Sequence, residues 1–390
     1  MKVLIFGLGG IGGLVGGALA DMYDNIYFYA RGASKEAIQA KGLRLDSVKL
    51  GNKVVHPQAV SDNAQELGLM DVIFLCTKGD KLAEVAQELQ PMMGPDTVLI
   101  PLLNGVLVSD QLRPHLSQGI LADGLIRTFS HIESPGHIVQ DGGPCDIRFG
   151  LQGGQNPESF QAIADRLTKA GIETKVSDHI ELDSWKKLAI TGTMSALLCY
   201  YDGNVGYVRE QVGDGTTIDD AYHELQAVAA AAGVNISDDY IDTLINNFKT
   251  CDPETITSLY RDLKAGKAPQ DTELDLMVGY VVKKGEALGV PTPIFTKAFQ
   301  SFRHKTITED MPLLEAFQVS PVIPEVFVNY GLDCLFCGVA TNESVKQACM
   351  SHGMSEREIE YMIGDMNEYL KNITPEEEEA ARSSIFGGGF

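Results

Sequence analysis

A glycine-rich turn near the N-terminus is the feature that most constrains the fold of this chain. Residues 2–6 (KVLIF) form a short apolar run, and residues 7–12 (GLGGIG) follow it directly. The next segment, LVGGALA, has a helical pattern, so the glycines stand between a predicted buried strand and a predicted helix. In this context the G-x-G-x-x-G spacing is typical of a dinucleotide-binding βαβ unit, whereas a glycine-rich turn elsewhere can be only a turn.

Each glycine of the motif has a separate physical task. Gly7 permits the tight turn, Gly9 lets the backbone approach a pyrophosphate, and Gly12 lets the helix pack closely on the strand. The phosphates would then lie at the helix N-terminus, where free N–H groups and the helix dipole favour anions. The predicted cofactor-binding residues of the turn are Gly7, Leu8, Gly9, Gly10, Ile11 and Gly12.

The end of the second predicted strand indicates which dinucleotide fits. Residues 25–29 (NIYFY) form this strand, and Arg31 follows it at a place where an NAD enzyme usually carries an acidic residue. A guanidinium suits a 2′-phosphate by charge and by bidentate geometry, so NADP(H) is the predicted cofactor. The alternative is that Arg31 is an ordinary surface arginine at a strand end.

Two further predicted strands end in polar residues. Residues 71–77 (DVIFLCT) lead to Lys78, and residues 97–103 (TVLIPLL) lead to Asn104. Ligands of open parallel sheets bind beyond the carboxyl ends of the strands. Lys78 would therefore contact cofactor phosphate or ribose, and Asn104 would hold a substrate oxygen. The alternatives are a solvated loop lysine and a turn-forming asparagine before Gly105.

A polar stripe marks the helical segment DSWKKLAITGTMSA. On a helix, Lys187, Thr191 and Ser195 share one face at positions i, i+4 and i+8. Lys186 points elsewhere and is expected to pair with Asp183 at the surface. A lysine on an otherwise apolar helix is costly unless it lines a cavity or meets a partner. Lys187 is therefore the candidate functional lysine, and the alternative is that it merely extends its ammonium to solvent.

Two more polar residues are candidates in the same part of the chain. Glu273 lies at the start of a predicted helix and shares a face with Leu276 and Met277, so it would point inward. It would orient a substrate hydroxyl or the lysine, or it would only stabilise the helix start. Ser258, in ITSLYRDL, would add a hydroxyl group or be ordinary helix surface.

The order of these segments resembles that of one enzyme family. GLGGIG, YARG, LLNG, SWKKLA, TSLYRDL and TELD follow one another as in the ketopantoate reductases (2-dehydropantoate 2-reductases), over about residues 1–305. The resemblance implies a Rossmann domain joined to an all-helical domain, NADPH as cofactor and a role in pantothenate biosynthesis. The implied catalytic residues are Lys187, Asn104 and Glu273, and the implied substrate and cofactor contacts are Ser258, Asn104, Arg31 and Lys78.

The chain departs from this family beside the lysine. Thr191 and Ser195 stand where the family usually has asparagines that help to hold the substrate hydroxyl. These shorter side chains would also bind substrate, but they leave open which 2-oxo acid fits. The sequence thus predicts reduction of a 2-oxo acid to a 2-hydroxy acid, with Lys187 as general acid. The alternative is a non-catalytic NADPH or redox sensor.

The residues beyond 305 extend past the reductase resemblance and carry clustered cysteines. The stretch of about residues 307–371 carries the C-x-x-C pair Cys334 and Cys337 after a tyrosine-glycine helix end, and it is similar to the small redox-disulfide domain associated with hybrid-cluster proteins. Cys334 and Cys337 form a C-x-x-C pair, which is typical of a redox disulfide where a helix N-terminus lowers a thiol pKa. With Cys349 and His352 they would also permit a metal site of three thiolates and one imidazole. Inert thiols are the third interpretation.

These signals predict a chain of four segments. Strands at 127–132, 146–150 and 173–176 and a helix at 157–170 complete the first of them. The segments are a Rossmann-type, doubly wound α/β domain (1–178), an all-helical substrate and catalytic domain (179–305), a small helical C-x-x-C domain (306–371) and an acidic, glycine-rich tail (372–390).

Composition argues against several classes of function. Seven cysteines in 390 residues do not form the framework of a secreted disulfide protein. The formal charge of −22 disfavours nucleic acid and anionic membranes as partners. No apolar run reaches membrane-spanning length and the N-terminal run is too glycine-rich for a signal peptide, so a cytoplasmic location is expected. The predicted partner is a small 2-oxo acid; a homodimer and a thiol-redox partner stay open.

Overall fold

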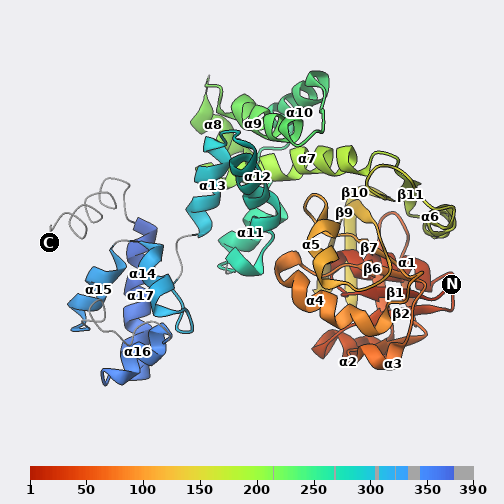
Figure 1. Cartoon of the computed structure of the whole chain (residues 1–390), viewed down its shortest axis with the longest axis horizontal. Coiled ribbons are helices and arrows are strands. Elements are labelled where there is room, and N and C mark those ends of the chain that lie inside the picture. The colour runs from red at the N-terminus through yellow and green to blue at the C-terminus, as the bar shows by residue number, and fades with distance from the viewer. Residues whose placement is uncertain (214, 268, 304–306, 321, 333–342, 373–390) are drawn as a thin grey trace. The chain divides into compact units, whose positions relative to one another are not determined.

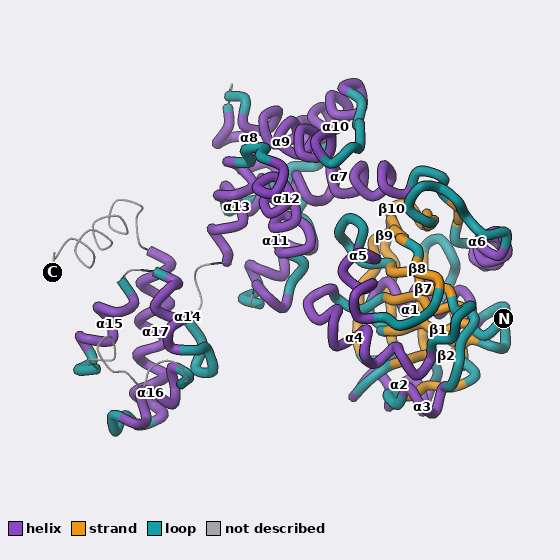
Figure 2. Tube along the Cα trace, in the orientation of Figure 1, coloured by secondary structure: helices purple, strands orange, loops and turns teal. Residues whose placement is uncertain are grey.

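The chain forms two compact units, Met1–Thr296 and Lys297–Phe390 (Figure 1). The computed structural model describes all residues except 214, 268, 304–306, 321, 333–342 and 373–390. The first unit contains an α/β part and a helical part, and the second contains only helices among its described residues (Figure 2). The boundaries of the predicted four-segment division stay a prediction.

A six-stranded parallel sheet forms the centre of the α/β part and confirms the predicted Rossmann-type fold. Counted within the sheet, its strand order is the 3-2-1-4-5-6 order of dinucleotide-binding folds. The strand that leads into the glycine turn lies in the middle, where Val3 pairs with Ile26 on one side and with Val72 on the other. In sheet order the strands are β5 (Ala59–Ser61), β2 (Ile26–Tyr29), β1 (Val3–Phe6), β6 (Val72–Leu75), β7 (Val98–Pro101) and β8 (Ile120–Leu121).

Helices cover both faces of this sheet. Alternate strand residues such as Ile5 and Phe74 share one apolar core with α1, and their neighbours such as Leu4 and Leu75 share another with α4. This is why the strands are continuously apolar rather than alternating. The helices of this part are α1 (Gly10–Ala20), α2 (Gly32–Lys41), α3 (Ala64–Leu67), α4 (Leu82–Leu89) and α5 (Val108–Leu112), with short 3₁₀ turns η1 (Gly79–Lys81), η2 (Gln90–Met92) and η3 (Arg113–His115).

A second sheet, which the sequence did not predict as a separate layer, packs on α1. The strands expected at 127–132, 146–150 and 173–176 all belong to it. A Cβ at Gly13 would come within 2.2 Å of the Ile138 side chain, so a glycine beyond the motif lets this sheet approach α1. The sheet contains β3 (Leu43–Ser47), β4 (Lys53–Val55), β9 (Asp123–Ser134), β10 (His137–Gly150) and β11 (Glu173–Val176), and α6 (Ser159–Lys169) packs against β11.

The helical part of the first unit is built around α7 (Ile180–Tyr201), which confirms the predicted all-helical architecture. This helix packs on five other helices and also contacts β9 and β10. A helix surrounded in this way needs apolar residues on most of its circumference. Around it lie α8 (Val205–Val212), α9 (Thr217–Ala231), α10 (Asp238–Thr250), α11 (Ser258–Lys264) and α12 (Leu274–Leu288), followed along the chain by α13 (Pro293–Arg303), with η4 (Pro269–Asp271) before α12.

The second unit is a small helical domain with its own apolar core. Buried side chains such as Phe327, Met362 and Met366 form this core. Ser355 and Glu358 bond each other reciprocally and form a capping box at the start of the last helix. The helices are α14 (Leu313–Val319), α15 (Ile323–Asn329), α16 (Val345–Ser351) and α17 (Glu356–Asn372).

Candidate active site

The glycine turn has the geometry that its motif requires. Gly7 has a φ of +96°, a left-handed conformation that glycine adopts without strain. A Cβ at Gly12 would lie only 1.9 Å from the Gly7 carbonyl oxygen, so a side chain there would push α1 off the turn. At Gly9 a Cβ would meet nothing nearer than the Cys76 carbonyl oxygen at 4.0 Å. The backbone at Gly9 is therefore open to a ligand.

Two buried hydroxyl groups flank this turn without hydrogen-bond partners in the described part of the chain. They belong to Thr77 and Ser130. Thr77 packs against Gly7, and the backbone of Ser130 lies beside Gly10. Buried hydroxyl groups are normally hydrogen-bonded, and the N-cap of α1, Gly9, offers no side chain to the free N–H groups of the helix. The turn therefore fits the pyrophosphate of a dinucleotide.

Arg31 lies at the end of β2 as predicted, but its guanidinium already has partners. It forms an ion pair with Glu88 of α4 and donates a hydrogen bond to the Tyr29 hydroxyl at 3.3 Å. These contacts with Tyr29 and Glu88 raise the pKa of Arg31 above its ordinary value, so the group stays charged. No acidic residue directly follows β2 in the sequence, and Glu88 was not predicted as a partner of Arg31 because it lies far along the chain.

Lys78 links the sheet to the helical part of the unit. Its ammonium donates to Asp262 of α11 at 2.8 Å, and Asp262 also accepts from Lys267 at 2.6 Å. Burial alone would raise the pKa of the Asp262 carboxyl, but the two lysines hold this pKa below its usual value. A cofactor phosphate at Lys78 would compete with a carboxylate that is charged at neutral pH.

The Lys187 side chain is half-buried on α7, and its ammonium group is strongly desolvated. No described residue hydrogen bonds or ion pairs with it. Burial lowers the pKa of Lys187 to about 8, although the nearby carboxylates of Glu273 and Asp146 favour the charged form. Asp146 itself is held by Arg127, which donates to it at 2.9 Å. An ammonium with a pKa close to neutrality is well suited to give up a proton.

Asn104 and Glu273 meet across the two parts of the unit. The Asn104 amide, in the loop after β7, donates to the Glu273 carboxylate at 2.8 Å. Glu273 is the N-cap residue of α12 and contributes to the electrostatic environment of Lys187. The structure thus brings together the three residues that were predicted to be catalytic, from a loop and two different helices.

The predicted substrate-binding hydroxyl groups lie in three different environments. Thr191 donates to the Lys187 carbonyl oxygen of its own helix at 3.1 Å. Ser195 is fully buried and donates to Thr257 at 2.9 Å, and Thr257 caps the helix that begins at the exposed Ser258. These contacts tie Ser195 to the start of α11, and its contact with substrate stays a prediction.

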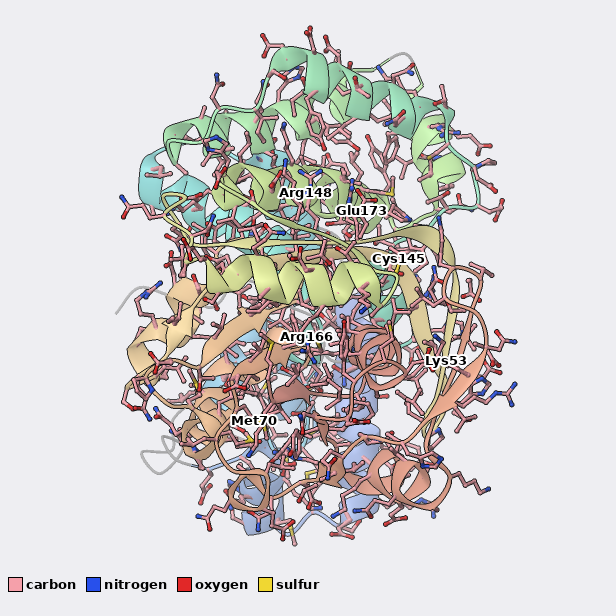
Figure 3. The ribbon with its side chains drawn as sticks, turned by 90° about the vertical axis from the view of Figure 1, so that its right-hand side faces the viewer. Lys53, Met70, Cys145, Arg148, Arg166 and Glu173 are labelled. Carbon is pink, nitrogen blue, oxygen red and sulfur yellow. The ribbon has the colours of Figure 1, made fainter. Side chains whose placement is uncertain are left out.

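The expected pair between Lys186 and Asp183 is replaced by other contacts. Asp183 accepts from Arg148 of β10 at 2.6 Å and from Ser177 at 2.7 Å. The Lys186 ammonium lies 5.0 Å from the ring centre of Tyr240. Figure 3 shows Arg148 on the side of β10 turned toward the helices. Asp183 therefore anchors α7, and with it Lys187, to the second sheet.

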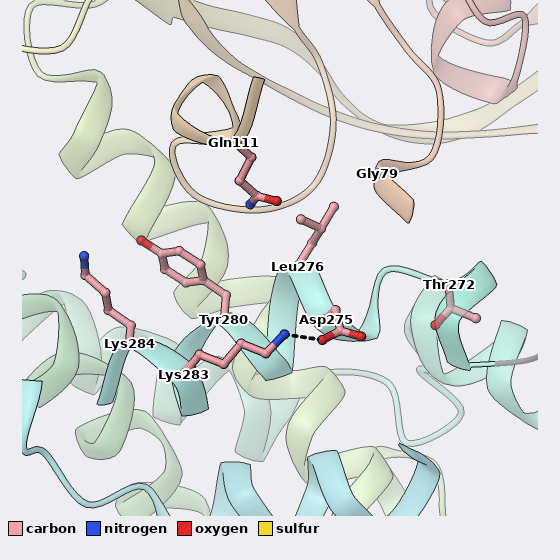
Figure 4. Close-up of a pocket in the computed structure, with 8 residues that line it drawn as sticks. All are labelled: Gly79, Gln111, Thr272, Asp275, Leu276, Tyr280, Lys283 and Lys284. Carbon is pink, nitrogen blue, oxygen red and sulfur yellow. Dashed lines mark hydrogen bonds and ion pairs between the residues drawn. The ribbon is translucent and has the colours of Figure 1, made fainter. Parts of the chain in front are cut away.

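A cavity of about 460 Å³ opens on α12 (Figure 4). It does not include Lys187, Asn104 or Glu273. Tyr280, which lines it, packs on the buried Trp185 with ring centres 5.6 Å apart. The lining residues are Gly79, Gln111, Thr272, Asp275, Leu276, Tyr280, Lys283 and Lys284.

The predicted metal candidates are only partly within the described residues. Cys334 and Cys337 lie outside them, Cys349 is buried in the core of the second unit, and His352 is exposed after α16. Among the described residues, no three His, Cys, Asp or Glu side chains are placed to share a metal ion.

No helix that the structure describes is both long enough and apolar enough to cross a membrane.

Comparison with known proteins identifies the family. The family description "Ketopantoate reductase PanE/ApbA" matches residues 3–153, and its C-terminal counterpart matches residues 179–306, together more than half of the chain. The chain belongs to the ketopantoate reductase family. Residues 307–359 match a domain of unknown function, DUF1858.

Individual relatives agree with this assignment. An uncharacterized oxidoreductase, YkpB, of Bacillus subtilis is 25% identical over 303 residues, which is 78% of this chain and 98% of the relative. The 2-dehydropantoate 2-reductase of Mesorhizobium japonicum is 27% identical over 324 residues, covering 75% of this chain and 94% of that enzyme. The chain is accordingly an oxidoreductase of this family.

Solved structures are similar over the same region. A PanE/ApbA family ketopantoate reductase from Ralstonia eutropha is 26% identical with a TM-score of 0.68, covering 78% of this chain and 97% of that one. A D-mandelate dehydrogenase in complex with NADH is 25% identical with a TM-score of 0.63, covering 77% and 97%. The cofactor class predicted from the glycine turn, a nicotinamide dinucleotide, agrees with these findings.

Proposed function

We propose that this chain reduces a 2-oxo acid to the corresponding 2-hydroxy acid with NADPH. The observation that carries the proposal is the half-buried, desolvated ammonium of Lys187, which lies near Glu273 and has no hydrogen-bond partner among the described residues. Family membership supports the reaction class, and the open backbone at Gly9 supports a dinucleotide site. A cytoplasmic role in pantothenate biosynthesis is part of the same proposal.

The residues of the chain supply the proton and hold the carbonyl group. When bound, the nicotinamide supplies the hydride that reduces the keto carbon. Lys187 donates a proton to the carbonyl oxygen as negative charge develops there, and a pKa of about 8 keeps it protonated at neutral pH. Glu273 favours the charged lysine, and the second N–H of the Asn104 amide remains for the same oxygen.

The identity of the 2-oxo acid is the least constrained part of the proposal. 2-Dehydropantoate is the first candidate, because a relative is a 2-dehydropantoate 2-reductase. Ser195 is bonded to Thr257 and Thr191 to its own helix, whereas the family resemblance implies an asparagine amide at each of these two positions. A 2-oxo acid with a different side chain is the second candidate, since a similar structure is a D-mandelate dehydrogenase.

Preference for NADPH is proposed on the charge of Arg31. A guanidinium at the end of β2 attracts a 2′-phosphate, and Lys78 adds a second positive charge at the same edge of the sheet. Both groups have acidic partners in the structure, Glu88 and Asp262, which weaken that attraction. We therefore expect the preference for NADPH over NADH to be modest.

The proposal is tested by incubating the full-length protein with NADPH and a panel of 2-oxo acids that includes 2-dehydropantoate. Loss of absorbance of the reduced nicotinamide measures turnover. Lys187→Ala should reduce turnover by roughly 10² or more while NADPH still binds, because only the proton donor is lost. Lys186→Ala, the adjacent lysine on the same helix, serves as the matched control. NADPH binding without turnover of any 2-oxo acid would replace the proposal with the non-catalytic sensor.

A further inference from the structure

Three side chains form a closed set of contacts at the end of β2. Arg31 pairs with Glu88 and donates to the Tyr29 hydroxyl at 3.3 Å, and that hydroxyl donates to Glu88 at 3.1 Å. The Tyr29 ring is held by stacking on Phe6, with ring centres 4.2 Å apart. The carboxylate of Glu88 is therefore held by two donors, the Arg31 guanidinium and the Tyr29 hydroxyl, and the Tyr29 ring is itself stacked on the buried ring of Phe6.

Glu88 reaches this position from a different element. It lies in the last turn of α4, and the apolar side of that helix, including Val85 and Leu89, is buried against the sheet. Its side chain keeps 32% of its surface exposed, and that of Arg31 keeps 62%. Both charged groups are thus accessible to a ligand at the end of β2.

In dinucleotide-binding folds the end of the second strand is where the adenosine ribose is recognised. An acidic residue there accepts a hydrogen bond from the ribose 2′-hydroxyl of NAD(H), and an arginine accommodates the 2′-phosphate of NADP(H). This chain holds both groups in contact, because Arg31 follows β2 while Glu88 comes from α4. The two groups favour opposite nucleotides.

We propose that Glu88 determines the choice between the two nucleotides, by accepting the 2′-hydroxyl of NADH and by repelling the 2′-phosphate that Arg31 attracts. The protein then binds both nucleotides, with a modest preference that is set by the balance of these two charges. Like charges a few ångströms apart oppose each other even in a well-solvated site. The inference rests on the nicotinamide site of the proposed function and is independent of the chemistry at Lys187.

The competing explanation is that the ion pair of Arg31 and Glu88 only stabilises the fold. Exposed ion pairs of this kind contribute little to stability. Under that explanation, removal of the carboxylate charge would change the binding of NADPH and NADH by the same factor. The ratio of the two dissociation constants therefore separates a role in specificity from a structural role.

The test titrates the full-length protein with NADPH and with NADH in separate experiments, without a 2-oxo acid, and follows the fluorescence of the reduced nucleotide. Glu88→Gln keeps the shape of the side chain and removes its charge. The ratio of the NADH to the NADPH dissociation constant should rise at least about fivefold, in line with one charge at contact distance. Arg31→Ala should lower the same ratio, because it removes the attraction for the 2′-phosphate.

Glu84→Gln is the matched control. Glu84 lies one turn earlier on α4 and is exposed, so its substitution removes the same charge from the same helix. The ratio should stay within about twofold of the parent value, since the charge is farther from the ribose site. Glu88→Ala is the second variant and should shift the ratio in the same direction as Glu88→Gln.

Two results would overturn the inference. The first is that the ratio of the NADH to the NADPH dissociation constant is the same in both Glu88 variants as in the parent protein or in Glu84→Gln. The other is a parent protein that binds neither nucleotide. A parent that binds nucleotide but reduces no 2-oxo acid leaves the inference standing and contradicts only the proposed reaction.

Discussion

The charge of Lys187 makes the proposed reaction dependent on pH in a defined direction. Burial lowers the pKa of this ammonium to about 8, so the proton donor is present below that pH and is lost above it. For the reduction, kcat/KM is expected to be level below about pH 8 and to fall up to about tenfold per pH unit above it. A pH profile of NADPH oxidation measures this, with Lys186→Ala as the variant that keeps the parent profile. A profile that stays level well above the pKa would remove Lys187 as the acid.

The same ammonium should cost the protein stability at neutral pH. Its pKa is about 8 in the folded state against 10.5 for the unfolded reference, so the folded state binds fewer protons between these values. The cost is fully present below about pH 8 and is relieved as the pH rises toward 10.5. Lys187→Met should therefore raise the free energy of unfolding at pH 7 by about 1–3 kcal/mol, after allowance for residual exposure.

Urea unfolding at neutral and at strongly alkaline pH measures this difference. The gap between Lys187→Met and the parent should narrow at alkaline pH, because the parent lysine is then neutral as well. Lys186→Met should give no comparable gain, since the Lys186 ammonium lies over the Tyr240 ring. A Lys187→Met variant less stable than the parent at pH 7 would mean that the ammonium has a compensating interaction.

Residues of the candidate site were predictable where local spacing determines their position. Lys187, Asn104 and Glu273 each follow from a strand end or a helix face, and the structure places them together. Glu88 and Arg148 were not predictable in this way. Their partners, Arg31 and Asp183, are distant in sequence, and only the completed fold brings such charges into contact.

At the scale of elements, two glycines of the turn between β1 and α1 have different tasks. Gly12 is expected to be needed for folding, and Gly9 is expected to be needed for binding of the dinucleotide. A Cβ at Gly12 would lie 1.9 Å from backbone, whereas one at Gly9 would meet nothing nearer than 4.0 Å. Gly12→Ala should destabilise the protein by about 2 kcal/mol or more, as overpacking against backbone does. Gly9→Ala should fold within about 1 kcal/mol of the parent and bind NADPH at least tenfold more weakly.

Thermal unfolding and nucleotide titration of the two variants distinguish these effects. Ala18→Gly, within α1, is the control for a change in helix propensity alone. Gly32→Ala cannot serve as a control, because Gly32 has a φ of +52° and alanine would be strained there. Full NADPH affinity in Gly9→Ala would show that the pyrophosphate does not approach the turn at that residue.

The fold was predictable in its central sheet and not in its second one. Strands β1, β2, β6 and β7 are short apolar runs separated by helices, and such alternation determines a parallel sheet. The second sheet depends on β10 pairing with β3, in the register His137 with Arg44. This pairing joins residues far apart in sequence, and the strand containing Arg44 alternates polar and apolar residues like any surface strand. No local pattern specifies that contact.

At the scale of the whole molecule, the proposed nucleotide and catalytic residues all belong to one of the two compact units. The glycine turn, Arg31 and Lys187 all lie within Met1–Thr296, while Lys297–Phe390 contains a separate apolar core. Within the first unit, the sheet and the helices are tied by the Lys78–Asp262 ion pair and by the Asn104–Glu273 hydrogen bond. We therefore expect the first unit to unfold as one body, and the second to unfold separately.

Differential scanning calorimetry of the full-length protein should accordingly show two transitions. A ligand that binds only the native state stabilises it by about 2.7 kcal/mol at a concentration one hundred times its dissociation constant. NADPH at that concentration should raise the transition of the first unit and leave the other in place, because no part of the proposed nucleotide site belongs to the second unit. Gly9→Ala should abolish the shift without removing either transition. A single transition that NADPH moves as a whole would instead mean that the two units unfold cooperatively, which would contradict their separate unfolding.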